Sequence, residues 1–351
     1  MGVLANPLQS VAQQAEAGTA SAGRGGEDAL TTLVRLVESD LQDCNRTIVA
    51  RMDSEVSLIP QLAAHLVAAG GKRIRPLLTL AAARLCGYAG ARHVKLAACV
   101  EFIHTATLLH DDVVDDSKLR RGLASANAVF GNKASVLVGD FLFARAFQLM
   151  VEDGSLRVLD ILCRASATIA EGEVLQLVTQ NDLGSGEAQY LQVIGGKTAA
   201  LFTAAAEVGA VVAERPAVEE RALADYGTAL GMAFQLVDDA LDYAADQETL
   251  GKTVGDDFRE GKVTLPVLVA YAEGDAEERA FWERTIDQNE QTEADLLRAM
   301  TLIAKHDGIG ATLRRAADFA GKAKASLAIF PVSEMREALM AVADYTVSRV
   351  S

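Results

Sequence analysis

Two short acidic motifs, each following an apolar run, constrain this chain more than any other feature. The first, DDVVD, covers residues 111–115, and the second, DDALD, covers residues 238–242. A helix turns by roughly 100° per residue, so Asp111 and Asp115 lie on one face, one turn apart, while Asp112 turns to the side. Carboxylates that face the same way repel each other unless a cation or a proton lies between them.

This arrangement predicts a metal site. Carboxylate oxygens are hard ligands that suit Mg²⁺, which usually keeps waters and shares its coordination shell with substrate phosphates. For one motif alone, a solvated acidic turn is the better explanation. A second motif within an apolar helical pattern is hard to explain in that way. The aspartates of the two motifs are therefore candidate metal ligands.

The composition favours long helices. Half of the 351 residues are hydrophobic but only 5% are aromatic, and there are only six prolines. Residues 1–27 lack periodicity and are predicted to be a disordered leader. The remainder, residues 28–351, is predicted to be a single all-α domain, a bundle of long helices around a central cavity, without strands. Beyond residue 76, helices are predicted over residues 77–85, 94–118, 133–152, 155–178, 188–213, 218–245, 263–272, 277–285, 293–306, 308–329 and 333–348.

Net charge and cysteine content limit the classes of function and the cellular compartment that are expected. A net charge of −15 argues against nucleic-acid binding, which needs a basic surface. The four cysteines lack metal-ligand spacing, and no secretory signal is evident, so a reducing cytoplasmic location is expected. The longest apolar stretch, residues 134–151, contains Asp140 and Arg145 and is not predicted to span a membrane.

Basic residues cluster at two places. In GGKRIRP, residues 70–76, three cations follow a glycine pair at the start of a predicted helix, where free N–H groups and the helix dipole also favour an anion. An exposed basic turn is the alternative. Arg120 and Arg121 follow the first acidic motif, where they could equally compensate the dipole of a helix end.

Further polar residues share faces with the acidic motifs. His104 lies two helical turns before Asp111 on the same stripe, and Gln235 precedes the second motif in the same way. Lys197 and Thr198 follow a glycine pair that can admit a kink. The glycine-punctuated loop 251–262 carries a lysine near each end, Lys252 and Lys262.

Taken together, these motifs resemble the trans-isoprenyl diphosphate (polyprenyl) synthases, most closely the bacterial octaprenyl or longer-chain type. The similarity extends from residue 70 to residue 266 through GGKRIRP, FIHTATLLHDDVVDDSKLRRG, GDFLFARAF, GGKTAAL, FQLVDDALDY and GKTVGDDFREGKVTLP. The resemblance implies an isoprenoid synthase fold and a prenyltransferase that adds isopentenyl diphosphate to an allylic diphosphate such as farnesyl diphosphate. It also implies a homodimer. The product could serve as a quinone side chain, and its release could involve transient membrane contact.

The same resemblance implies roles for individual residues. Asp111, Asp115 and Asp238 would ligate Mg²⁺, and Asp112, Asp239 and Asp242 would be supporting or shared metal ligands. Metal-assisted ionisation of the allylic diphosphate would depend on Asp111, Asp115, Asp238 and Lys197. The isopentenyl diphosphate contacts would be Lys72, Arg75, His104 and Arg121. The allylic diphosphate contacts would be Arg120, Lys197, Thr198, Gln235, Lys252 and Lys262. Released pyrophosphate would take the proton, so no dedicated base is expected.

Product length is predicted to depend on the residues behind the first motif. The growing chain would run along the first acidic helix over Thr107 and Ile103. Shorter-chain relatives place large aromatic residues at the positions of Thr107 and Ala106, so the small residues here would leave the tunnel open, although ideal helix geometry turns Ala106 about 140° from Asp111. A helix of about 25 residues is roughly 37 Å long, enough to line about eight isoprene units.

Other functions remain open from the sequence. A shorter-chain, geranylgeranyl-type synthase would share every motif, and a non-catalytic subunit of a heteromeric synthase could retain the fold. A class I terpene cyclase would need neither the GGKRIRP site nor normally a second DDxxD. A head-to-head synthase would also lack the basic element.

Overall fold

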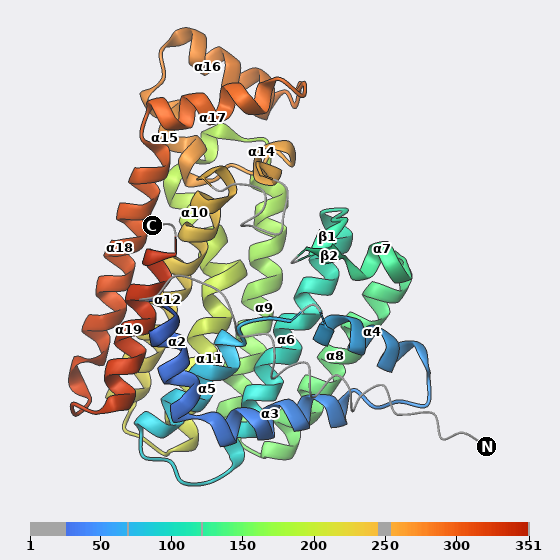
Figure 1. The fold of residues 1–351 in the computed structure, drawn as a ribbon, viewed down its shortest axis with the longest axis vertical. Helices are drawn as coiled ribbons and strands as arrows, with labels where there is room; N and C mark the ends of the chain where they lie inside the picture. Colours follow the sequence, from blue (N-terminus) through green and yellow to red (C-terminus); the bar gives the residue numbers. More distant parts are fainter. Residues whose placement is uncertain (1–25, 69, 121, 245–253, 350–351) are drawn as a thin grey trace.

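Long helices packed side by side form a single bundle in the computed structural model (Figure 1), which describes residues 26–68, 70–120, 122–244 and 254–349. The predicted all-α class is confirmed. The predicted leader lies outside the described residues up to residue 25, and the first described helix begins at Gly26. The helices of the first half are α2 (Gly26–Leu36), α3 (Glu38–Arg51), α4 (Leu58–Ala68), α5 (Ile74–Leu85), α6 (Arg92–Val114), α7 (Ala126–Phe130), α8 (Asn132–Asp153) and α9 (Leu156–Thr179).

The second half contains the other acidic helix and two π-helical segments. Most helix limits lie within two or three residues of those predicted. The elements are η1 (Leu183–Ser185), α10 (Gly186–Ile194), the π-helical η2 (Gly195–Ala199), α11 (Ala200–Val212), α12 (Ala217–Ala244), α14 (Asp256–Arg259), α15 (Leu265–Glu273), α16 (Ala276–Trp282), the π-helical η3 (Glu283–Asp287), α17 (Asp295–Lys305), α18 (Gly308–Ser326), η4 (Leu327–Ile329) and α19 (Glu334–Ser348).

The end of the first acidic helix differs from the prediction. Helix α6 ends at Val114 rather than at residue 118, because Asp116 adopts a left-handed conformation with φ +48° and the Ser117 N–H donates to the Asp112 carbonyl over 2.9 Å. The chain then forms a two-stranded antiparallel ladder of β1 (Leu119–Arg120) and β2 (Leu123–Ala124). The prediction of no strands was wrong here, since strands of two residues carry no detectable alternation.

Small residues allow the central helices to approach closely. A Cβ added at Gly227 of α12 would lie 2.4 Å from the Phe202 carbonyl oxygen of α11, and one at Gly231 would lie 2.6 Å from the Cα of Ala199. Alanine and glycine at these contacts explain how a chain with few aromatic residues still packs densely. The main core joins residues of α2–α9, α11, α12, α18 and α19.

A second, smaller core lies at the end of the bundle where α14–α17 pack (Figure 1). Trp282 is fully buried there and its ring meets Phe258 of α14 edge-on. The Gln291 side chain donates to the Phe258 carbonyl over 2.8 Å. These contacts fix the segment that leads from α14 to Lys262.

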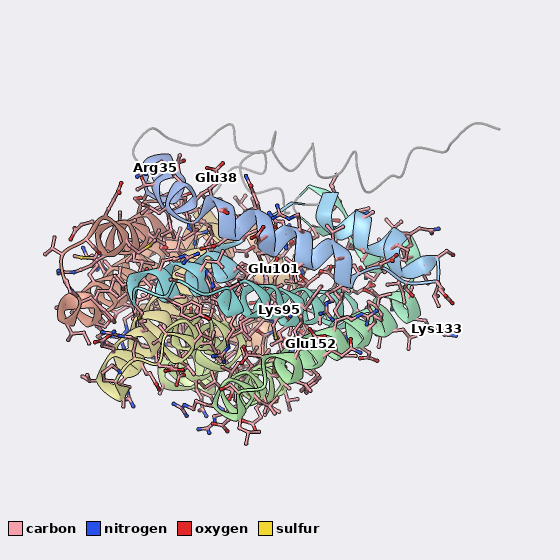
Figure 2. All side chains as sticks on the ribbon, turned by 90° about the horizontal axis from the view of Figure 1, so that it is seen from below. Arg35, Glu38, Lys95, Glu101, Lys133 and Glu152 are labelled. Atoms are coloured by element: carbon pink, nitrogen blue, oxygen red, sulfur yellow. The ribbon has the colours of Figure 1, made fainter. Side chains whose placement is uncertain are left out.

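The outer surface of α3, α6 and α8 is charged. Figure 2 shows this layer, in which Lys95 of α6 lies 3.5 Å from Glu152 of α8. Arg51 of α3 also pairs with Glu152 over 2.5 Å. Exposed ion pairs of this kind add little to stability, so buried apolar packing is what holds these helices together.

One described helix, α8, is long and apolar enough to cross a membrane by length and composition alone. It packs against α6, and Leu142, Ala146 and Leu149 are fully buried. Core helices of compact proteins pass the same test. The side of α8 away from α6 nevertheless carries exposed apolar residues, namely Val136, Leu137, Phe147 and Val151.

Candidate active site

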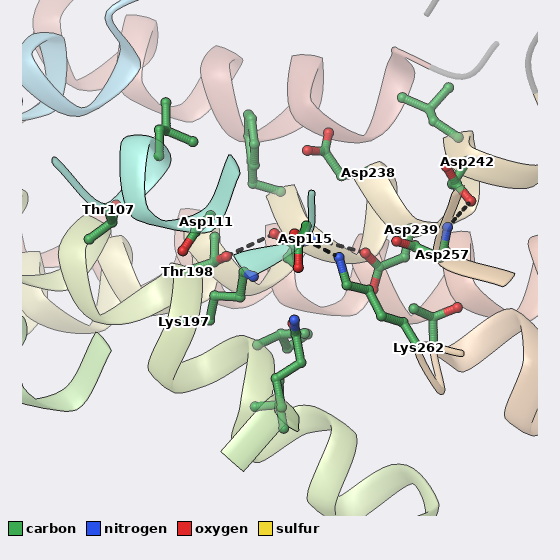
Figure 3. A pocket seen from close by; sticks show the side chains of 18 of the residues that line it. Thr107, Asp111, Asp115, Lys197, Thr198, Asp238, Asp239, Asp242, Asp257 and Lys262 are labelled. Atoms are coloured by element: carbon green, nitrogen blue, oxygen red, sulfur yellow. Dashed lines mark hydrogen bonds and ion pairs between the residues drawn. The ribbon is translucent and has the colours of Figure 1, made fainter. Parts of the chain in front are cut away.

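The C-terminal ends of α6 and α12, which carry the two acidic motifs, line one cavity of about 1080 Å³ below α14 (Figures 1 and 3). Two predicted residues, Arg121 and Lys252, lie outside the described part of the chain. The predicted site residues that line the cavity are Lys72, Arg75, His104, Thr107, Asp111, Asp115, Arg120, Lys197, Thr198, Gln235, Asp238, Asp239, Asp242 and Lys262.

On the α6 side, Asp111 and Asp115 both face the cavity, as their spacing predicts. Burial raises the pKa of Asp111 to about 7; Lys197 opposes this shift, while Glu173 and Asp115 add to it. Asp115 follows the last helical residue and accepts a hydrogen bond from Lys262 over 3.1 Å. The cations near Asp111 therefore do not fully offset the effect of burial on its carboxylate.

On the α12 side, neighbouring aspartates have different environments. The Asp238 side chain is 40% exposed, and it lies 3.5 Å from Arg349. Asp239 is buried and accepts hydrogen bonds from Tyr190 over 2.5 Å and from Gln235 over 2.8 Å. Burial and the nearby Asp257 raise the pKa of Asp239 to about 7. Asp242 accepts a hydrogen bond from the Asp257 backbone N–H.

The donor set suits a hard divalent cation. All candidate ligands are carboxylate oxygens, and burial raises the pKa values of Asp111 and Asp239 by more than their surroundings offset. Among the described residues, no three acidic, histidine or cysteine side chains already form a closed metal site. A cation here would complete its coordination with water and substrate phosphate, as Mg²⁺ commonly does.

Asp112 is held away from this cavity. It is 3% exposed, it forms an ion pair with Arg120, and the guanidinium Nε lies 2.9 Å from its Oδ1. The Asn127 side chain donates to its backbone carbonyl. The structure therefore pairs Asp112 with an internal cation rather than bringing it to the predicted metal site, because it projects from a different face of α6 than Asp111 does.

The glycine pair before Lys197 produces a π-helical segment rather than a simple kink. Gly172 of α9 crosses η2 so closely that a Cβ would lie 2.5 Å from the Lys197 backbone nitrogen. The extra residue per turn directs Lys197 and Thr198 into the cavity. There the Lys197 ammonium pairs with Glu173 over 2.9 Å, and the Thr198 hydroxyl donates to Gln235.

The cations of GGKRIRP have separate partners. Arg73, in a left-handed conformation with φ +50°, pairs with the buried Glu101 of α6. Lys72 donates to the Tyr345 hydroxyl over 2.7 Å. Arg75 stacks on the Phe202 ring and lies 3.1 Å from His104 Nε2. His104 is thereby joined to Arg75, which supports its predicted place beside the basic loop.

Lys262 lies among carboxylates from two segments. Its ammonium contacts Asp115 over 3.1 Å and Glu260 over 2.5 Å, and Figure 3 shows it pointing toward Asp115. Burial opposes the charged form, but Asp257, Asp115 and Glu260 together raise the pKa of Lys262. It thus bridges the α6 wall and the segment after α14.

Of the three predicted chain-length residues, only Thr107 lines the cavity. Ile103 and Ala106 are fully buried in the main core. Ala106 was predicted from the position at which shorter-chain relatives carry large aromatic residues, and the helix turns it away from Asp111 and toward other helices. A tunnel beyond Thr107 would therefore require core side chains to move.

Comparison with known proteins identifies the chain. Residues 56–303 match the family model described as polyprenyl synthetase. Octaprenyl diphosphate synthase of Escherichia coli is 48% identical over 91% of this chain and 99% of its own length. The chain belongs to the polyprenyl synthetase family. The expectation of a prenyltransferase from this family is confirmed.

Solved structures of polyprenyl synthases agree in fold. A polyprenyl synthase from Caulobacter crescentus, complexed with calcium and isoprenyl diphosphate, is 59% identical with a TM-score of 0.89 and covers 92% of this chain and 98% of its own. A decaprenyl diphosphate synthase from Rhodobacter capsulatus is 53% identical with a TM-score of 0.88 and covers 92% and 99%.

Several cavity residues of this polyprenyl synthetase were not predicted as site residues. Asp257 and Glu260 lie in a loop that the sequence did mark as glycine-punctuated, so their carboxylates could have been noticed. Glu173, Tyr190, Tyr345 and Arg349 gave no local signal, because each lies on, or directly after, a helix that carries no motif. The additional lining residues include Glu173, Tyr190, Asp256, Asp257, Glu260, Tyr345 and Arg349.

The raised pKa of Asp111 predicts a stability cost that depends on pH. Its pKa is about 7 in the folded protein against 3.8 normally, so the cost is absent below pH 3.8, grows as pH rises and is complete above pH 7. Without divalent metal, Asp111→Asn should raise the free energy of unfolding at pH 8 by about 2 kcal/mol and by less at pH 5.5. Urea unfolding at both pH values measures this. Asp318→Asn, at an exposed position on α18, is the control, and equal gains at both pH values would contradict the assignment.

Proposed function

We propose that the protein is a long-chain all-trans-polyprenyl diphosphate synthase. It would add isopentenyl diphosphate units to an allylic diphosphate such as farnesyl diphosphate. The observation that carries the proposal is the cavity itself, in which two acidic walls face each other and basic residues flank them on separate sides. Octaprenyl and decaprenyl diphosphate synthases among the similar proteins support the long-chain product.

The metal in this proposal is Mg²⁺, held by Asp111 and Asp115 from α6 and by Asp238 from α12. Asp239 and Asp242 would share in binding the cation or support these ligands, and Asp112 would act only through Arg120. The relative from Caulobacter crescentus was solved with calcium and isoprenyl diphosphate, which supports the use of a divalent cation. When bound, the cation would neutralise the diphosphate leaving group and so favour cleavage of the allylic C–O bond.

Two basic clusters would hold the two substrates. Lys72 and Arg75 lie at the start of α5, and His104 of α6 lies 3.1 Å from Arg75. These three residues line the cavity and would bind isopentenyl diphosphate. Lys197, Thr198 and Gln235 lie on η2 and α12 and would bind the allylic diphosphate, with Lys262 and Arg120 at its edge. Arg121 and Lys252 retain the isopentenyl and allylic roles given by the family resemblance.

The cavity residues would then act by position and charge. Lys197 and Lys262, already facing the cavity, would stabilise negative charge on the departing pyrophosphate. The double bond of isopentenyl diphosphate would attack the allylic cation, and the product would lose a proton to the released pyrophosphate. His104, the histidine that lines the described cavity, lies 3.1 Å from Arg75 and is assigned to isopentenyl diphosphate binding in this proposal.

A product of eight or more isoprene units suits a quinone side chain, and its release would involve transient membrane contact. A cytoplasmic location forms part of the proposal, because all four cysteines are free thiols.

Incubation of the purified protein with Mg²⁺, farnesyl diphosphate and labelled isopentenyl diphosphate tests the function. We expect a linear product of eight or more units by reversed-phase thin-layer chromatography. Asp111→Ala should lower turnover by at least about 100-fold at saturating Mg²⁺, because it removes a ligand on the α6 wall. Cyclic hydrocarbon, a four-unit product or no incorporation by the wild type would contradict the proposal.

Thr107→Phe should shorten the product, because Thr107 lines the cavity one turn below Asp111. The added ring would occupy the space into which the chain grows. Thr107→Val, which keeps nearly the same volume, is the matched control and should leave product length unchanged. An unaltered product from Thr107→Phe in the same chromatographic assay would refute growth past this residue.

The homodimer is also part of the proposal. Helices α8 and α9 expose apolar side chains along the side away from the core, an unusual concentration for a protein surface. A two-fold axis would let each copy cover the other's patch. The exposed residues are Val136, Leu137, Phe147 and Val151 on α8, and Leu156, Val174, Leu177 and Val178 on α9.

Leu137→Asp should convert the dimer into a monomer, because it places a charge within this apolar surface. Sedimentation velocity of the wild type and the variant measures the change. Val332→Asp is the control, since Val332 is exposed in the loop before α19, far along the chain from α8. A wild-type monomer, or a variant that remains dimeric, would count against the α8–α9 interface.

A further inference from the structure

Asp239 lies where three elements meet. Its Oδ2 accepts a hydrogen bond from the Tyr190 hydroxyl of α10 over 2.5 Å, and its Oδ1 accepts one from the Gln235 Nε2 over 2.8 Å. The Gln235 Oε1 in turn accepts a hydrogen bond from the Thr198 hydroxyl of η2 over 2.8 Å. A continuous series of hydrogen bonds therefore joins α10, the second acidic motif and the π-helical segment.

The Tyr190 ring is held rigidly. The residue is 5% exposed and belongs to a compact apolar cluster with Ile194 of its own helix, Leu236 of α12 and Leu265 of α15. Its hydroxyl nevertheless reaches the cavity wall. The phenol O–H is the hydrogen-bond donor in this contact, and the Asp239 carboxylate is the acceptor.

The contrast with Asp238 shows what this bond does. The Asp238 side chain is 40% exposed, and among the described residues its one ion pair is with Arg349 over 3.5 Å, so its side chain can adjust. Asp239 has a donor on each oxygen, which fixes the rotation of its carboxylate group. Asp238 can therefore change its side-chain orientation when a ligand binds, whereas two hydrogen bonds already hold the Asp239 carboxylate in one orientation.

We propose that Tyr190 is a positioning residue for metal binding, because it orients the Asp239 carboxylate toward the cavity. The inference rests on the proposed function and extends it to a residue outside both motifs. Partners that orient a metal-binding carboxylate typically contribute 10- to 100-fold to metal affinity. Because the same series of bonds reaches Thr198, the orientation of Asp239 is tied to the element that faces the allylic diphosphate.

Metal binding measured directly tests this role. The probe is Mn²⁺ in the presence of inorganic pyrophosphate, with free Mn²⁺ followed by electron paramagnetic resonance. Tyr190→Phe removes only the hydroxyl and should raise the Mn²⁺ dissociation constant about tenfold or more. Turnover at limiting Mg²⁺ should fall in parallel and recover at high Mg²⁺.

Tyr226→Phe is the matched control. Tyr226 is a fully buried tyrosine whose hydroxyl makes one hydrogen bond, over 2.8 Å, to the Leu339 carbonyl, and it does not line the cavity. Both variants lose a buried phenol hydroxyl, so both should lose some thermal stability. Only Tyr190→Phe should change the Mn²⁺ dissociation constant.

The outcomes separate the inference from the proposed function. A Tyr190→Phe dissociation constant within twofold of the wild type, or an equal change in Tyr226→Phe, overturns the role of Tyr190. Failure of the wild type to bind Mn²⁺ with pyrophosphate overturns the proposed metal site instead. If circular dichroism shows that Tyr190→Phe does not fold, Gln235→Met removes the other donor to Asp239. The same increase is then expected, and its absence overturns the inference.

Discussion

Carboxylates that face one another inside a partly buried cavity repel, and the protein compensates with internal cations placed beside them. Lys262 lies among Asp115, Glu260 and Asp257, and Lys197 pairs with Glu173. Arg349 approaches Asp238 from the end of α19. The compensation is incomplete at Asp111 and Asp239, whose pKa values are both raised to about 7. The buried carboxylates lower the free energy of unfolding, and the same excess of negative charge would favour binding of a cation.

The same cations suit the binding of diphosphates. In the proposed function, an ammonium that pairs with a carboxylate in the metal-free protein would contact a phosphate oxygen when a cation binds the carboxylates. Lys197 and Lys262 both line the cavity together with the two acidic motifs. Metal binding and substrate binding would then be linked, because the cation would neutralise the carboxylates that these ammonium groups leave.

Close helix packing makes this arrangement rigid. The crossing of Gly172 over η2 leaves no room for a Cβ, and it fixes the π-helical turn that presents Lys197 and Thr198. The small core around Trp282 fixes the segment that carries Lys262. Apolar packing thus holds the polar side chains of the site in place. The Tyr190 ring, packed in an apolar cluster, is a further example.

Helical periodicity relates side chains along one segment, so the amino-acid sequence was enough to predict the helices and the shared face of Asp111 and Asp115. The glycine pair before Lys197 likewise predicted an irregularity in that helix. The family motifs also indicated most of the residues around the cavity. Contacts between segments, which the sequence pattern does not specify, pair Asp112 with Arg120 and bury Ile103 and Ala106 in the core. They also bring Glu173, Tyr190 and Arg349 into the site. These placements depend on how distant helices pack, and the periodicity of a single helix contains no information about its neighbours.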